Sequence, residues 1–166
     1  MSSFPLRPVR RIWQAATLLS TLAILGCATG TPDELPPDFG KLVPVKGTVK
    51  IKGKPLRGVV VTFLPPKWSA SNGETDADGS YTLETARKPG ALPGEYKVAI
   101  SYLVSADGQP QGLAPRSSMS PSLGMSTAQE KLPAEFSDLG RTTLKATVPS
   151  GGGTFDFDLP IDLDTK

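Results

Sequence analysis

The sequence predicts an all-β protein, namely a β-sandwich of about six or seven short strands. Glycine and proline, 17 of each among 166 residues, interrupt the chain too often for long helices. Several short segments alternate apolar with polar side chains, which is the pattern of a half-buried strand. Clusters of turn-forming residues separate these segments, as they do in sandwich folds.

The first half of the predicted sandwich follows from three segments. Residues 43–52 alternate valine and isoleucine with lysine and threonine, and a Gly-Lys-Pro turn comes next. Residues 59–64 form a continuous apolar and β-branched run, which is typical of a central strand. Two prolines end that run, and the polar stretch after it, including Asn72, is expected to be a loop. A short third strand over residues 81–83 directs a tyrosine and a leucine to one face.

The second half contains the clearest strand, over residues 96–103, where tyrosine, valine and isoleucine alternate with lysine, alanine and serine. Near the C-terminus, residues 144–148 and 155–159 each carry an apolar stripe, and the glycines at 151–153 separate them. This arrangement predicts a hairpin in which the aromatic side of the last strand sets the register.

Composition excludes several classes of function. The chain has no histidine and one cysteine, so it holds no histidine-dependent catalytic triad, no histidine-ligated zinc or haem site and no intramolecular disulfide. We expect no cofactor. The first 26 residues contain three arginines and no acid, so their removal leaves 15 bases and 16 acids, a net charge of −1. A charge this close to neutral predicts no nucleic-acid partner.

Residues 1–26 have the pattern of a secretory signal. Arginines precede the apolar run 12–25, which is shorter than the roughly 20 apolar residues that a spanning helix needs. Ile24-Leu25-Gly26-Cys27 resembles a bacterial lipoprotein lipobox. This resemblance implies that residues 1–26 are removed and that Cys27 is acylated, which anchors the protein to a membrane outside the cytoplasm. A plain secretory signal or an uncleaved anchor is the alternative.

The rest of the chain is expected to be a tether followed by one domain. Residues 27–42 are polar and rich in proline, which predicts an extended tether that holds the domain away from the bilayer. The domain then covers residues 43–164. Within it, residues 105–131 are a flexible, low-complexity loop. Met119 and Met125 of this loop are candidates for a partner contact, and simple disorder is the other interpretation.

Asp76 and Asp78, followed by glycine, resemble the beginning of a calcium-binding loop. Such a loop needs a bidentate glutamate about eleven residues after its first aspartate. This chain has Arg87 there. We therefore expect a β-turn in which the aspartate side chains accept bonds from backbone N–H groups and Gly79 has a positive φ. Asp76 and Asp78 as metal ligands are the alternative.

Trp68 lies in a polar segment between strands, and we expect it to be a partly buried plug of its loop. The alternative is a partner contact, either a sugar-stacking platform or an interface anchor. Lys46, Lys50 and Lys52 line one face of the first strand. We expect them to be solvated or to protect a sheet edge, with contact to an anionic polymer or lipid headgroups as the alternative.

Several segments together resemble a known family. They are Val45-Lys-Gly-Thr-Val49 with Gly53-Lys-Pro-Leu56, Thr75-Asp-Ala-Asp-Gly-Ser-Tyr81, Pro93-Gly-Glu-Tyr-Lys-Val98, Leu132-Pro-Ala-Glu-Phe136 and Phe155-Asp-Phe157. This set is similar to the carboxypeptidase regulatory-like, transthyretin-like domain, and especially to small lipoproteins of that type in planctomycete-like bacteria. The resemblance implies a seven-stranded Greek-key β-sandwich that is usually non-catalytic. Transthyretin-like hydroxyisourate hydrolases share the fold, but their histidines have no counterpart here.

The expected function is therefore that of a non-catalytic, lipid-anchored module of the cell envelope that binds another envelope protein or a polysaccharide. A structural spacer or surface component without a dedicated ligand is the alternative. An enzyme would have to work through Asp and Glu alone. Glycoside hydrolysis of that kind places two carboxyl groups ~5–9.5 Å apart in a cleft, for which a small sandwich has little room.

Overall fold

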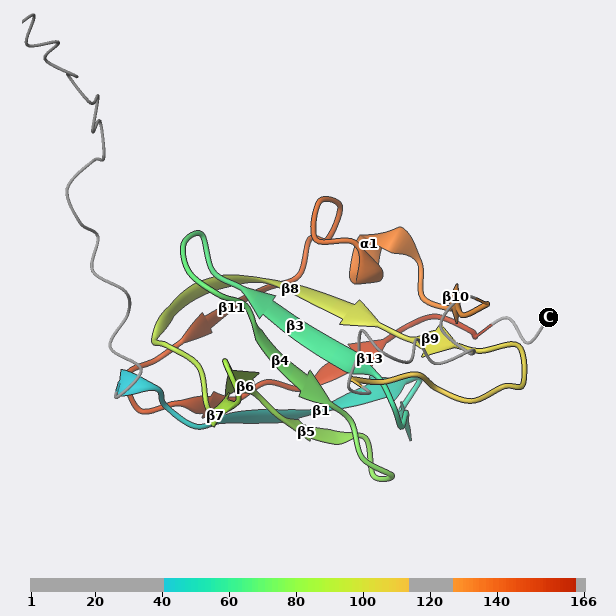
Figure 1. Cartoon of the computed structure of the whole chain (residues 1–166), viewed down its shortest axis with the longest axis horizontal. Helices are drawn as coiled ribbons and strands as arrows, with labels where there is room; N and C mark the ends of the chain where they lie inside the picture. Colours follow the sequence, from blue (N-terminus) through green and yellow to red (C-terminus); the bar gives the residue numbers. More distant parts are fainter. Residues whose placement is uncertain (1–40, 114–126, 164–166) are drawn as a thin grey trace, which may run out of the picture. The chain divides into compact units, whose positions relative to one another are not determined.

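The computed structural model describes residues 41–113 and 127–163. This part of the chain is all-β, as predicted, and it contains thirteen strands and one single-turn helix (Figure 1). The strands are β1 (Val45–Ile51), β2 (Lys54–Pro55), β3 (Val60–Leu64), β4 (Ser71–Glu74), β5 (Ser80–Thr82), β6 (Glu84–Thr85), β7 (Lys88–Pro89), β8 (Gly94–Ser101), β9 (Leu103–Val104), β10 (Gln129–Glu130), β11 (Lys145–Val148), β12 (Gly153–Thr154) and β13 (Phe157–Leu159), and the helix is α1 (Ala134–Ser137).

Three of the predicted sites, Cys27, Met119 and Met125, lie outside the described residues. The signal, the lipidation and the methionine contacts therefore stay predictions. Among the residues that the structure describes, no helix is both long enough and apolar enough to cross a membrane.

The first sheet is built around β1, both edges of which are paired. β12 and β13 run parallel to β1 along one edge, where Lys46 is opposite Thr154. β5 and β2 are antiparallel to β1 along the other edge, where Lys46 is opposite Thr82. Because β1 is a central strand, its lysines do not protect a sheet edge, and that part of the prediction is wrong. The other part, a solvated face, is confirmed for Lys46 and Lys52, which are exposed.

The second sheet has the order β11-β8-β3-β4-β6-β7 and is antiparallel throughout. β3 lies between β8 and β4, which confirms the prediction of a central strand there. Strand β4 was missed, and Asn72 lies in it rather than in a loop. Its sequence, Ser-Asn-Gly-Glu, contains no apolar residue, so it lacks the alternation that identifies a strand. The inward positions are instead filled by the small residues Ser71 and Gly73.

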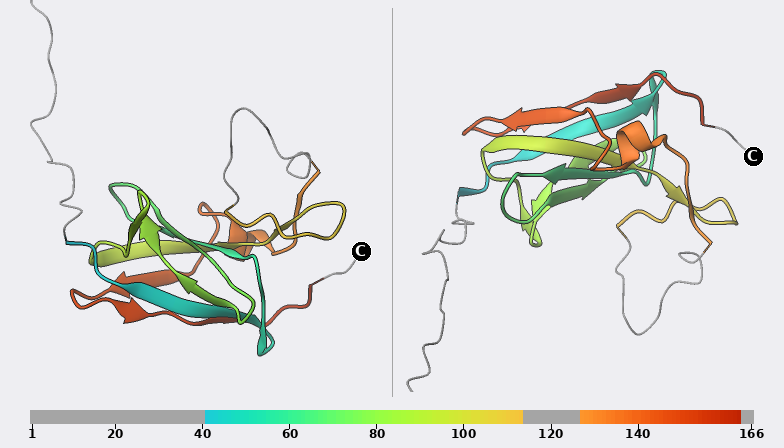
Figure 2. Two further views of the ribbon diagram at one scale, coloured as in Figure 1. Left: turned by 60° about the horizontal axis from the view of Figure 1, so that its bottom comes forward. Right: turned by 90° about the horizontal axis from the view of Figure 1, so that it is seen from above.

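The core lies between the two sheets, and Figure 2 shows β1 with β13 on one side and β3 with β8 on the other. Val45 and Val49 of β1 face Val61, Phe63 and the inward side chains of β8, and all of these are buried. The Phe63 ring is central to this core: its centroid lies 5.6 Å from that of Tyr96 and 5.5 Å from that of Phe155. Aromatic pairs at this separation add to the stabilisation from burial alone.

The predicted C-terminal hairpin is wrong. β11 pairs with β8 in the second sheet, with Val148 opposite Gly94, whereas β12 pairs with β1 in the first sheet. The glycine-rich segment between them carries the chain from one sheet to the other. Gly152 has a φ of +81°, and the N–H of Gly153 donates to the carbonyl of Pro44, which starts the new pairing. The apolar stripes of residues 144–148 and 155–159 both face the core, but each does so from a different sheet.

The predicted loop over residues 105–131 is described at its two ends, over 105–113 and 127–131. These ends form specific contacts. β10 pairs with β9. The backbone N–H of Leu113 donates to the Glu74 carboxylate at 2.7 Å. Both ends of the loop are thus held against the sandwich.

Candidate functional site

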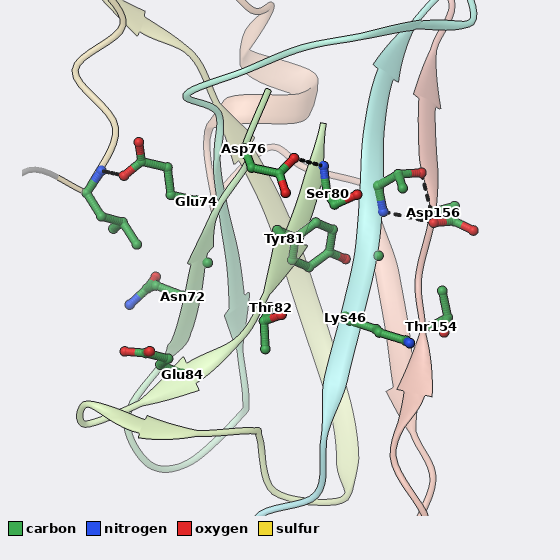
Figure 3. Close-up of a pocket in the computed structure, with 14 residues that line it drawn as sticks. Lys46, Asn72, Glu74, Asp76, Ser80, Tyr81, Thr82, Glu84, Thr154 and Asp156 are labelled. Carbon is green, nitrogen blue, oxygen red and sulfur yellow. Dashed lines mark hydrogen bonds between the residues drawn. The ribbon is translucent and has the colours of Figure 1, made fainter. Parts of the chain in front are cut away.

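A polar groove of about 650 Å³ crosses the outer surface where β4 of one sheet comes next to β5 and β1 of the other. Figure 3 shows Tyr81 in its middle, with Asn72 and Glu84 on one side and Lys46 and Thr154 on the other. Strand register sets these positions. Thr82, Lys46 and Thr154 lie directly opposite one another on three adjacent strands, so their side chains share a face.

The floor of the groove depends on a break between β12 and β13. In a regular parallel ladder the N–H of Thr48 would donate to the carbonyl of Phe155. Here it donates instead to the carboxylate of Asp156 at 2.8 Å, and the Thr48 hydroxyl donates to the same oxygen at 2.9 Å. The displaced carbonyl of Phe155 accepts a hydrogen bond from the Tyr81 hydroxyl at 2.8 Å.

Two glycines leave room for the Tyr81 ring. A Cβ at Gly47 would overlap the Phe155 carbonyl and lie 2.9 Å from the Tyr81 hydroxyl oxygen. A Cβ at Gly73 would lie 2.6 Å from the carbonyl oxygen of Thr82. Burial raises the pKa of the Tyr81 hydroxyl, and the negative charge of Asp156 raises this pKa further. Tyr81 is therefore a neutral hydrogen-bond donor at physiological pH.

Three of the four groove carboxylates hold the backbone in place. Asp156 accepts a hydrogen bond from the backbone N–H of Thr48 in β1, and Glu74 accepts one from the backbone N–H of Leu113. Asp76 accepts bonds from the N–H groups of Asp78 and Ser80, each at 2.9 Å. Gly79 has a φ of +73°, so the predicted turn is confirmed at Asp76, whereas Asp78 enters it through its backbone N–H. Both bonds reach the same oxygen, Oδ1, so they fix the orientation of the Asp76 carboxylate and leave Oδ2 as an acceptor.

The remaining polar side chains of the groove are available to a ligand. Within the described part of the chain, no hydrogen bond or ion pair is found for the side chains of Lys46, Thr82, Glu84 or Thr154. The side-chain carbonyl of Asn72 accepts from the Thr62 hydroxyl at 2.9 Å, which leaves its amide as a donor. The groove therefore offers both donors and acceptors, which come from the five strands β1, β4, β5, β6 and β12.

Trp68 lies on a different surface. It lines a second cavity, of about 420 Å³, here called the Trp68 pocket, which shares no lining residue with the groove. The apolar part of the pocket consists of Pro65, Pro66, Trp68, Leu92, Pro93 and Tyr96. Trp68 is 39% exposed, so it combines partial burial in its loop with an open indole face. Its φ of +80° is rare for a bulky side chain.

The structure separates the residues that the sequence singled out. Asp76 lines the groove, whereas Trp68 belongs to its own pocket. Lys52 pairs with Asp162, with 2.6 Å between the Nζ atom and the carboxylate oxygen. Sequence reasoning missed Thr82, Glu84 and Thr154 as groove residues. An outward polar residue on a strand carries no signal of its own. Strand register places Thr82 and Thr154 on either side of Lys46, and the pairing of β6 with β4 places Glu84 beside Asn72.

Comparison with known proteins adds little to this description. No protein-family model and no curated protein matches the chain. Among solved structures, the chain is similar to the dioxygenase domain of a dioxygenase–carbohydrate-binding protein fusion from the cellulolytic bacterium Streptomyces sp. SirexAA-E. The identity is 25%, and the match covers 80% of this chain and 92% of that chain, with a TM-score of 0.31. A likeness at that TM-score supports no functional argument.

Proposed function

We propose that the protein is a non-catalytic, lipid-anchored binding module of the cell envelope, and that its polar groove binds a hydroxyl-rich polymer such as an envelope polysaccharide. The fold that we propose for it is a seven-stranded Greek-key sandwich of the transthyretin-like type. The observation that carries this proposal is the row Thr82, Lys46 and Thr154 in register across three strands. Asn72 and Glu84, directly opposite one another on the adjacent strands β4 and β6, form a second pair on the other side of the groove (Figure 3).

Groove chemistry suits a polyhydroxylated ligand better than an apolar one. Small-molecule sites are usually apolar clefts with few polar groups, whereas most residues that line this groove have a polar side chain. Hydroxyl groups of a sugar donate to Glu84 and accept from Lys46 and from the amide of Asn72. The lining contains four carboxylates and one lysine, a net charge of −3. That field favours a neutral or cationic polymer and repels an anionic one.

The same lining argues for binding rather than catalysis. Asp76 and Asp156 each accept two hydrogen bonds, and Glu74 accepts one, from the chain itself. A pair of carboxyl groups that works as acid and nucleophile or base needs both members free to reach the substrate. In the described part of the chain, Glu84 makes no such bond, whereas the chain fixes the orientation of the other three groove carboxylates.

Anchoring is tested by the mass of the protein extracted from a membrane fraction of its native host. We expect a chain that begins at Cys27 and carries acyl groups, and we expect Cys27→Ser to release the protein from the membrane fraction. An intact chain of residues 1–166 without lipid would contradict the anchor. A cleaved chain without lipid would make the protein a free secreted domain.

Binding is tested by cosedimentation with three insoluble polymers: neutral cellulose, cationic chitosan and anionic polygalacturonate. We expect retention on one of the first two and none on the third. Lys46→Ala and Glu84→Ala should each weaken the retention about tenfold, because a hydrogen bond to a charged group contributes roughly 1.5–3 kcal/mol.

The matched control is Lys145→Ala. Lys145 is an exposed lysine on β11 of the other sheet, and it does not line the groove. This variant should bind like the unmodified protein. Equal binding by all variants would place the polymer elsewhere on the molecule. Absence of binding to any polymer would favour the structural spacer.

A further inference from the structure

The Trp68 pocket has the surface chemistry that binds proline-rich chains. Its apolar lining consists of three prolines, a leucine, a tryptophan and a tyrosine. Aromatic-lined grooves of this kind bind segments in the polyproline II conformation, because such segments are already extended and lose little entropy on docking. The Tyr96 hydroxyl donates to the Leu92 carbonyl at 2.6 Å and the residue is 4% exposed, so Tyr96 closes the base of the pocket without adding a free polar group.

Trp68 combines an unusual backbone conformation with an exposed fraction of 39%. A φ of +80° in a residue other than glycine costs roughly 1–3 kcal/mol, and such strain persists where it serves a function. Trp68 and Leu113 are the large apolar residues that the described part of the chain leaves exposed. Leu113 lines the groove, so Trp68 is the exposed large apolar residue of the Trp68 pocket.

A suitable occupant lies directly before the described domain. The described residues begin at Lys41, and Lys41 itself lines the Trp68 pocket. The five residues at 35–39 are Leu-Pro-Pro-Asp-Phe, and Gly40 connects them to Lys41. A polyproline II segment rises about 3.1 Å per residue, so five residues span roughly 15 Å from that point. The segment therefore reaches the pocket without any long loop.

Charge also favours this occupant. Asp33, Glu34 and Asp38 are acidic, and no lysine or arginine occurs between residues 12 and 40. The pocket includes two lysines, Lys41 and Lys67, against one glutamate, Glu95. Residues 35–39 contain one charged residue, Asp38, and Asp33 and Glu34 directly precede them, so the sign of the charge complements the small net positive charge of the pocket. This attraction is strongest at low ionic strength.

The connection through Gly40 lowers the affinity that docking requires. Gly40 is the single residue between this segment and Lys41, and a link this short gives an effective concentration in the millimolar range. A contact with a dissociation constant of about 1 mM, or roughly 4 kcal/mol, is then half occupied or better. One stacked aromatic ring and two buried prolines are enough for a contact of that strength.

We propose that residues 35–39 dock in the Trp68 pocket of the same molecule and cover the exposed face of the indole. Docking joins the last part of the tether to the domain, so that the free tether ends near residue 34. This inference goes beyond the polymer-binding function and does not depend on it, because the groove and the pocket share no lining residue.

The test is acrylamide quenching of Trp68 fluorescence in the full chain. Trp13 is replaced by phenylalanine so that Trp68 is the single tryptophan. In the variant that also carries Pro36→Ser, Pro37→Ser and Phe39→Ser, the quenching constant should rise about twofold, because the covering segment no longer docks on the indole. These substitutions lie before the folded domain, and an unchanged far-ultraviolet circular dichroism spectrum checks that the fold is intact.

The matched control is Pro32→Ser, which removes a proline from the same tether but outside the docked segment. This variant should leave the quenching constant unchanged. In the protein that carries the unmodified segment, dilution should not change the quenching constant either. Equal quenching in the control and in the triple variant would overturn the proposal. Quenching that increases on dilution would overturn it as well, because a second copy of the chain would then be the occupant.

Discussion

Replacement of Gly47 by alanine should lower the free energy of unfolding by about 3 kcal/mol or more. The new Cβ would overlap the Phe155 carbonyl, which already accepts a hydrogen bond from the Tyr81 hydroxyl. Relief requires β1 and the chain between β12 and β13 to separate, and overpacking of this kind costs roughly 1–3 kcal/mol. Loss of the Tyr81 hydrogen bond leaves a carbonyl without its partner, at a further ~1–3 kcal/mol. Urea unfolding followed by circular dichroism measures the sum.

Gly151→Ala is the control for this substitution. Gly151 lies between β11 and β12, its φ is not positive, and a Cβ there would meet nothing within 4 Å. Its unfolding free energy should change by less than about 0.5 kcal/mol. If Gly47→Ala were as stable as Gly151→Ala, the close approach of Phe155 to β1 would be wrong. The break that forms the floor of the groove would then be wrong with it.

Phe63→Ala should destabilise the protein by about 3–5 kcal/mol. Phe63 is fully buried on the central strand of the second sheet, and its ring contacts aromatic side chains from both sheets. Truncation removes apolar surface and leaves a cavity between the sheets that neither can fill, since each is fixed by its own ladder. Thermal and urea unfolding should both report the loss.

Phe63→Leu retains most of the buried volume and should cost less, about 1–2 kcal/mol. Leu113→Ala supplies the surface control. Leu113 is 46% exposed, and its hydrogen bond to Glu74 comes from the backbone, so the substitution should change stability by less than about 0.5 kcal/mol. A Phe63→Ala protein as stable as Leu113→Ala would mean that the two sheets do not share this core.

The two substitutions probe different parts of one arrangement. Phe63 joins the sheets through the core, whereas Gly47 permits the contact at which Tyr81, Phe155 and Asp156 shape the groove floor. A milder change at the same contact is Tyr81→Phe, which keeps the ring and removes the hydroxyl. Gly47 and Tyr81 therefore connect the stability of the fold with the shape of the candidate site.

Sequence patterns predicted which side chains face the core in β1 and β8, and the structure confirms them there. They did not predict β4, because Ser71 and Gly73 fill its inward positions without any apolar side chain. They also misplaced the C-terminal strands. Val148 and Leu159 are both buried, as an apolar stripe predicts, but alternation does not tell which of two facing sheets a strand joins.

The sequence by itself thus determined the fold class, the inward faces of the main strands, the turn at Asp76 and the absence of any histidine-dependent chemistry. These are local properties, since they follow from neighbours along the chain. Only the tertiary structure decided that Thr82, Lys46 and Thr154 form one row and that the carbonyl of Phe155 turns toward Tyr81. Such contacts join residues more than thirty positions apart, where pairing free energy rather than local pattern selects the partner.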